Sequence, residues 1–136
     1  MRALLVIIVL AAAVLLGADD SPWIPTRIPA LRYPILGLQA RIAGKVSLRV
    51  SLDASGAVVE VRVISGPPVL AKAAQENMRL WKFAALRGER QPMGGEIDFL
   101  YVFKLEGEAV FAPMTDFVYE YPGQVMVTSH SQHWTP

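Results

Sequence analysis

The chain has 136 residues, with 13 basic and 12 acidic side chains, a net charge of +1 and no cysteine. The balanced charge gives no electrostatic reason to expect nucleic acid or an anionic membrane surface as a partner. The absence of cysteine excludes both a disulfide framework and a lipid attached through a cysteine.

Residues 1–18 are typical of a secretory signal peptide. A basic start at Arg2 is followed by an apolar run from Ala3 to Leu16, and small residues close the segment at Ala18. A run of about 14 apolar residues is short for a membrane-spanning helix, which needs about 20. We therefore predict cleavage after Ala18 and an exported chain. The alternative is a short uncleaved anchor, and only then is the membrane a partner.

Residues 19–32 are predicted to be an extended lead-in. Prolines remove backbone donors and block helix formation there. They are Pro22, Pro25 and Pro29. Without the signal about 118 residues remain, which is enough for one small domain. We place this domain at residues 33–106, with a C-terminal extension at residues 107–136.

The first part of the domain predicts a β-hairpin. Lys45 to Leu52 alternates between apolar and polar residues, as a half-buried strand does. Asp53 to Gly56 is a tight-turn sequence, and Ala57 to Ile64 resumes the alternation. This hairpin would place Arg49 opposite Glu60. The residues of the second strand expected to face inward are Val59, Val61 and Val63.

A helix and a third strand follow. Pro67 and Pro68 end the hairpin, because proline cannot continue a paired strand but fits the first turn of a helix. From Val69 the apolar residues recur at helical spacing and close on Trp81. Glu96 to Leu105 alternates again and predicts the last strand of the domain.

The extension has its own strand pattern. Its aromatic residues alternate with other side chains, and aromatic residues at this density are unusual in a disordered tail. They are Phe117, Tyr119 and Tyr121. We expect a strand within Thr115 to Thr128 to lie on the sheet or along the edge of its last strand.

Taken in order, these motifs resemble the C-terminal domain of TonB-type energy transducers. The matching residues are Tyr33-Pro34, Gly44, Asp53-Ala54-Ser55-Gly56, Ser65-Gly66-Pro67, Trp81-Lys82-Phe83 and Ile97 to Phe103. The resemblance implies an α+β fold with a three-stranded antiparallel sheet and two helices on one face. The extension could add strands to that sheet.

The resemblance also implies a periplasmic domain that binds a peptide of an outer-membrane receptor or another envelope protein. In the family, the peptide pairs with the exposed edge of the last strand, which is β-strand addition. The implied partner-binding residues are Ile97, Asp98, Phe99, Leu100, Tyr101, Val102 and Phe103, together with Tyr33 and Pro34. A link to outer-membrane transport stays open. Energy transduction is not carried over, because residues 19–32 reach about 45 Å at most.

The alternative function is a structural or assembly module of the cell envelope. In that case the tail, or a second copy in a homodimer, would fill the edge of the last strand. A tail paired within the chain would favour this alternative, and an open edge would favour peptide binding.

No residue pattern predicts an enzyme. Glu96 and Asp98 share a strand face, yet no nucleophile or third group accompanies them. His130 and His133 have His-x-x-His spacing but lie in what reads as a loose tail. We therefore predict no catalytic site, no cofactor and no metal.

Overall fold

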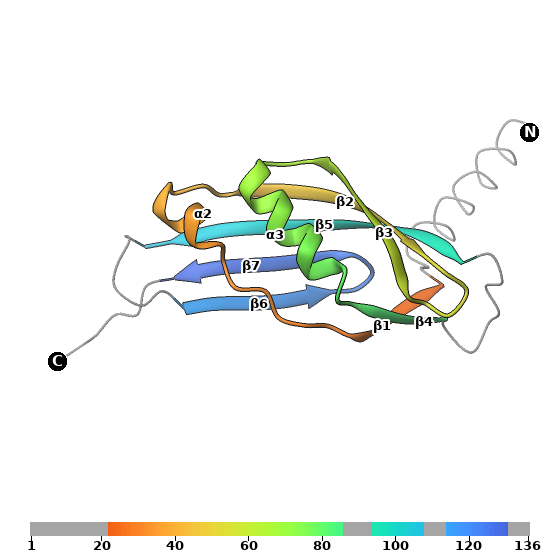
Figure 1. Cartoon of the computed structure of the whole chain (residues 1–136). Coiled ribbons are helices and arrows are strands. Elements are labelled where there is room, and N and C mark those ends of the chain that lie inside the picture. Colours follow the sequence, from red (N-terminus) through yellow and green to blue (C-terminus); the bar gives the residue numbers. More distant parts are fainter. Residues whose placement is uncertain (1–21, 86–93, 108–113, 131–136) are drawn as a thin grey trace, which may run out of the picture.

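The computed structural model describes residues 22–85, 94–107 and 114–130 of the chain. It shows two short sheets and two helices in these ranges (Figure 1). The elements are β1 (Trp23–Arg27), α2 (Ile35–Gln39), β2 (Gly44–Leu52), β3 (Val58–Ser65), α3 (Pro68–Met78), β4 (Lys82–Ala85), β5 (Gly95–Glu106), β6 (Met114–Glu120) and β7 (Gln124–His130). The predicted signal segment lies outside the described residues.

The main sheet has five strands in the order β3-β2-β5-β7-β6. The three antiparallel strands predicted from the sequence are present as β3, β2 and β5. The predicted three-stranded sheet was nevertheless too small, because the hairpin of β6 and β7 extends it. β7 lies between β5 and β6 and runs parallel to β5. The strand that follows β5 in sequence, β6, is therefore not its neighbour in the sheet. The next strand, β7, lies between the two.

The β2–β3 hairpin forms, but its register differs from the prediction. Arg49 lies opposite Arg62, and Glu60 lies opposite Ser51. The expected pair of Arg49 and Glu60 was therefore wrong, because Leu52 pairs with Val58 instead of Ala57 and the register shifts once more between Ser51 and Leu52. Val59 and Val63 are exposed, at 63% and 37%, so Val61 is the one residue of the predicted three that is buried.

The turn of this hairpin is built as predicted. The Asp53 carboxylate accepts hydrogen bonds from the backbone of Ser55 at 2.9 Å and of Ala57 at 3.0 Å. Hydrogen bonds, foremost from the Ser55 hydroxyl, hold the pKa of Asp53 below its usual value. Gly56 has a φ of 87°, and a Cβ there would come within 2.0 Å of the Phe83 carbonyl oxygen. Only glycine fits this position.

Both helices lie on the same face of the main sheet, and the core is between them and the strands (Figure 1). α3 ends at Met78, so Trp81 lies three residues beyond the helix that was expected to close on it, and it is buried, as predicted. Its ring stacks on Phe83 and meets the rings of Phe99 and Tyr119 edge-on. Trp81 therefore joins α3, β5 and the added hairpin. The opposite face of the sheet, which we call the open face, has no helix over it among the described residues.

Asn77 is a buried polar residue in this core that the sequence did not single out. Its side-chain oxygen accepts hydrogen bonds from Trp81 Nε1 at 2.9 Å and from the Tyr101 hydroxyl at 2.8 Å. Its amide nitrogen donates to the carbonyl of Pro29 at 2.9 Å. One side chain thus ties α3 to β5 and to the lead-in.

The lead-in is part of the packed structure. β1 pairs antiparallel with β4, and Trp23 is buried in the same core as Trp81. A Cβ at Gly95 would lie 2.6 Å from Trp23 Nε1, so the indole sits directly against the start of β5. Neither β1 nor β4 was predicted from the sequence.

Candidate partner-binding surfaces

The predicted binding residues on β5 divide between the two faces of the sheet. Four of them point into the core and are buried, as the alternation predicted. These are Ile97, Phe99, Tyr101 and Phe103. Asp98, Leu100 and Val102 alternate with them on the open face, where Val102 is also buried. A partner at this strand would therefore meet the backbone edge and the open-face side chains, and the core side chains would act through packing.

β7 occupies the second half of this edge. The parallel pairing begins at Leu100 with Gln124 and ends at Glu106 with His130. The Leu100 amide also donates to the Gly123 carbonyl at 2.8 Å, just before β7 begins. The stretch from Leu100 to Phe103 therefore already has a strand partner within the chain.

The first half of the edge is built differently. Among the described residues, no strand pairs with Gly95 to Phe99 on the side away from β2. The loop between β6 and β7 stops beside Asp98, where a Cβ at Gly123 would lie 2.5 Å from the Asp98 carbonyl oxygen. Glycine at this position lets the loop approach the strand closely.

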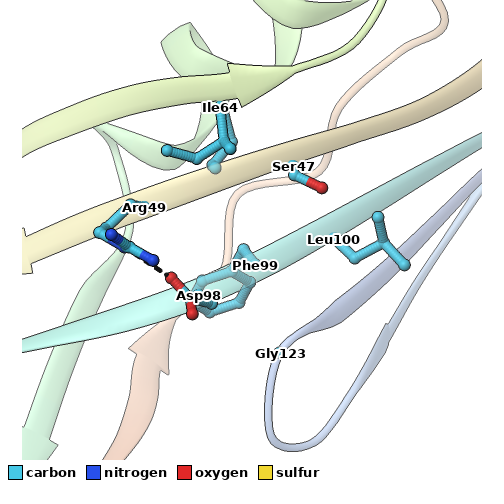
Figure 2. Close-up of a pocket in the computed structure, with 8 residues that line it drawn as sticks. Ser47, Arg49, Ile64, Asp98, Phe99, Leu100 and Gly123 are labelled. Atoms are coloured by element: carbon cyan, nitrogen blue, oxygen red, sulfur yellow. Dashed lines mark hydrogen bonds and ion pairs between the residues drawn. The ribbon is translucent and has the colours of Figure 1, made fainter.

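A hollow of about 320 Å³ opens on the open face next to this loop. Figure 2 shows its lining, with Ile64 from β3 and Leu100 from β5 on either side and Gly123 at the rim. Arg49 and Asp98 form an ion pair across two strands, with 3.0 Å between Nε and Oδ1. The hydrogen bond that Arg49 donates to the Asp98 carboxylate raises the pKa of Arg49. The hollow could hold an apolar side chain.

Tyr33 and Pro34 lie at the other end of β5. Tyr33 is buried, and its ring meets Phe103 edge-on at 5.5 Å. Its hydroxyl donates to the Ile42 carbonyl, and its amide donates to Thr115 Oγ1 at 3.2 Å. Burial raises the pKa of the Tyr33 hydroxyl. Phe103 is five residues along the strand from Asp98, or about 17 Å, so the nine predicted residues do not form one compact surface.

Pro34 begins α2 and lines a second hollow of about 300 Å³ between α2 and α3. Ile35 and Leu36 border this hollow and are both largely exposed. The residue pair Tyr33-Pro34 therefore anchors and starts α2, while the exposed side chains belong to the two residues after it.

His130 lies at the end of β7 and not in a loose tail. Its Nε2 is 3.0 Å from Asp116 Oδ2 on β6. His133 lies outside the described residues. Within residues 22–85, 94–107 and 114–130, no cluster of three side chains suited to a metal ion is found.

A family model for the C-terminal region of the Gram-negative bacterial TonB protein matches residues 29–105. The chain belongs to this TonB C-terminal family. The match includes the elements from α2 to β4 and nearly all of β5, and it leaves β1 and the β6–β7 hairpin outside. The resemblance seen in the sequence is thereby confirmed.

A solved structure agrees with the TonB fold. The solution NMR structure of the Pseudomonas aeruginosa TonB CTD is similar, with a TM-score of 0.53 and 22% sequence identity. The similarity covers 67% of this chain and 94% of that one. No curated protein matches the sequence. Neither helix in the described ranges is long and apolar enough to cross a bilayer.

Proposed function

We propose that this chain is a periplasmic protein-binding domain that binds a segment of an outer-membrane receptor or another envelope protein by β-strand addition. Membership of the TonB C-terminal family supports this, because in TonB the domain interacts with outer-membrane receptors and domains of this kind are not enzymes. The binding edge is the stretch of β5 from Ile97 to Phe103. A role in transport across the outer membrane would follow from such a partner.

The observation that carries the proposal is the stretch of β5 from Gly95 to Phe99, with which no strand pairs on the side away from β2 among the described residues. β7 pairs with β5 from Leu100 onward, and this pairing favours the structural alternative for that stretch. A partner strand must replace β7 from Leu100 onward, so the chain holds its own competitor for the site. Replacement is costly, because Val125 and Val127 on β7 are fully buried. Each buried valine contributes about 1.5–3 kcal/mol. A partner that binds well should therefore supply apolar residues at the same alternate positions.

A reversible lock on β7 tests this competition. The chain contains no cysteine, so two introduced cysteines can form only one intramolecular disulfide, the one between them. Lys104 and Thr128 are directly paired on the open face of β5 and β7. In the double variant K104C/T128C, oxidation should abolish binding of peptides from outer-membrane receptors of the same envelope. Reduction should restore it, as measured by NMR titration.

The matched control places the disulfide inside the hairpin. Val118 and Met126 are paired on β6 and β7, so the variant V118C/M126C keeps the hairpin intact but free to leave β5. This variant should bind equally well in both redox states. Unchanged binding by the oxidised K104C/T128C chain would show that the β5 edge is not where the partner pairs.

A second function has its own support. The rings of Phe117 and Tyr119 lie 6.5 and 5.5 Å from Trp81, so the hairpin is packed into the core of the domain. This packing favours a structural or assembly module whose edge stays filled by its own tail. Failure of every receptor peptide to bind the reduced chain would favour that module, and a mass measurement by light scattering would decide whether it forms a homodimer.

A further inference from the structure

The main sheet has two outer edges, and the edge at β3 is poorly suited to accept another strand. Its pairing with β2 is interrupted by two register shifts, which bend and twist the strand locally. In addition, Gln75 Nε2 from α3 donates to the Val61 carbonyl at 2.8 Å. Interruptions of this kind are how proteins protect a sheet edge from pairing.

The edge at β6 is regular. Its seven residues pair with β7 without a register shift, from Met114 with His130 to Glu120 with Gln124. Figure 1 shows β6 as the outermost strand of the main sheet, crossed by the lead-in, whose Tyr33 amide donates to the Thr115 hydroxyl on the helix face. Within the described ranges no further strand pairs with β6. Every second residue of such a strand directs its backbone N–H and C=O groups outward, where another strand can bond to them.

The side chains of β6 define what that strand would meet. On the open face, Asp116, Val118 and Glu120 are exposed and alternate as acid, apolar, acid. On the helix face, Phe117 and Tyr119 are half-buried against Trp81 and hold the strand in place. The strand is therefore anchored to the core, and two acidic side chains flank the apolar one on its open face, with Asp116 also 3.0 Å from His130 Nε2.

We propose that the outer edge of β6 is a docking site for a strand of a partner protein whose residues on the open face alternate as basic, apolar, basic. Basic side chains would lie opposite Asp116 and Glu120, and an apolar one opposite Val118. The pattern is symmetric about Val118, so it fits a parallel or an antiparallel partner. Cross-strand pairs of opposite charge stabilise such an addition, and like charges oppose it.

This site is separate from the proposed function at β5, because β6 presents its edge while the hairpin is docked. The oxidised K104C/T128C chain should therefore still bind at β6, even though no partner strand can pair with the stretch of β5 that β7 covers. The two proposals can fail independently in that one variant.

Two synthetic peptides of equal length test the charge pattern. One carries Lys-Val-Val-Ile-Lys-Thr between polar ends, and the other has glutamate at both lysine positions. NMR titration of the full chain at low salt should shift Met114 to Glu120 with the lysine peptide. The glutamate peptide should bind about tenfold more weakly. The difference should shrink as salt screens the charges.

The variant D116K/E120K should reverse this preference and bind the glutamate peptide. A folded variant with reversed preference supports the proposal even if Asp116 also contributes to the sheet through His130. Equal binding of both peptides, shifts confined to Val58–Ser65, or no binding by either peptide would overturn it. In the last case the two acids serve only to protect the edge from pairing.

Discussion

Asn77 shows how much of this core depends on one polar side chain. Three groups from separate parts of the chain bond to it: the Trp81 indole, the Tyr101 hydroxyl and the Pro29 carbonyl. A buried polar group with all its partners costs little, whereas a buried group that loses its partner costs its full desolvation. The bonds fix the positions of α3, β5 and the lead-in relative to one another.

We expect Asn77→Ala to lower the free energy of unfolding by about 2–4 kcal/mol, because it leaves the buried Trp81 and Tyr101 donors without their acceptor. Urea unfolding followed by tryptophan fluorescence measures the loss. Glu76→Ala is the matched control, since Glu76 is exposed on the same turn of α3 and should cost little. Equal midpoints for the two variants would contradict the role given to Asn77.

At the scale of the elements, the segment predicted to be an extended lead-in contains a paired strand, β1. β1 contains Pro25, which is compatible with an edge strand because its missing donor need not face a neighbour. Trp23 at the start of β1 fills the space above Gly56 and Gly95. The end of the core at the hairpin turn therefore depends on a segment that precedes the family match.

Trp23→Ala should destabilise the domain by about 3–5 kcal/mol, as expected for removal of a large aromatic side chain from a core. Arg27→Ala, an exposed change in the same strand, should leave the unfolding midpoint nearly unchanged. Thermal unfolding of both variants measures the difference. A Trp23→Ala chain with the stability of the parent would mean that the folded unit begins after β1.

Local patterns explain which elements could be predicted. The period-two alternation in β2 and β5, the turn at Asp53 and the helical spacing before Trp81 each depend on neighbouring residues, and all were found. β4 has four residues and follows Trp81 at once, so it carries too few residues for a period of its own. The parallel pairing of β7 with β5 depends on the path of the chain between them, which no local pattern records.

For the candidate site too, local sequence patterns predicted some features and missed others. Alternation along the last strand was enough to predict which side chains of Ile97 to Phe103 face the core. It could not show that β7 fills half of that edge, because pairing partners are set by the tertiary structure. The acid–apolar–acid pattern of β6 was visible in the sequence, but its place at the outer edge was not.

At the scale of the whole molecule, buried tyrosine makes stability depend on alkaline pH. Burial raises the pKa of the Tyr101 hydroxyl, and burial also raises those of Tyr33 and Tyr119. The folded chain keeps these protons at a pH where the unfolded chain, with a tyrosine pKa of about 10, releases them. The stabilisation is thus complete below about pH 10 and is lost as the pH rises beyond it.

We expect the urea midpoint to fall as the pH rises above about 10, and most of the tyrosinate absorbance to appear together with unfolding. In the variant Tyr101→Phe the urea midpoint should depend less on pH in this range. The variant also loses the hydrogen bond to Asn77, which lowers its stability at neutral pH. Complete titration of Tyr33, Tyr101 and Tyr119 in a chain that stays folded would contradict the burial described for them.

The hydrogen bond between the Tyr33 amide and Thr115 joins residues 82 positions apart in the sequence. β7, which pairs with β5, comes later still in the sequence. During synthesis β2 and β3 precede β5, and β7 is made last. Until β7 is made, the edge of β5 away from β2 is unpaired. Proteins with such distant pairings fold slowly, and unpaired edges invite aggregation in the interval. The order of synthesis therefore gives any chaperone or partner strand that binds β5 its best access before the hairpin arrives.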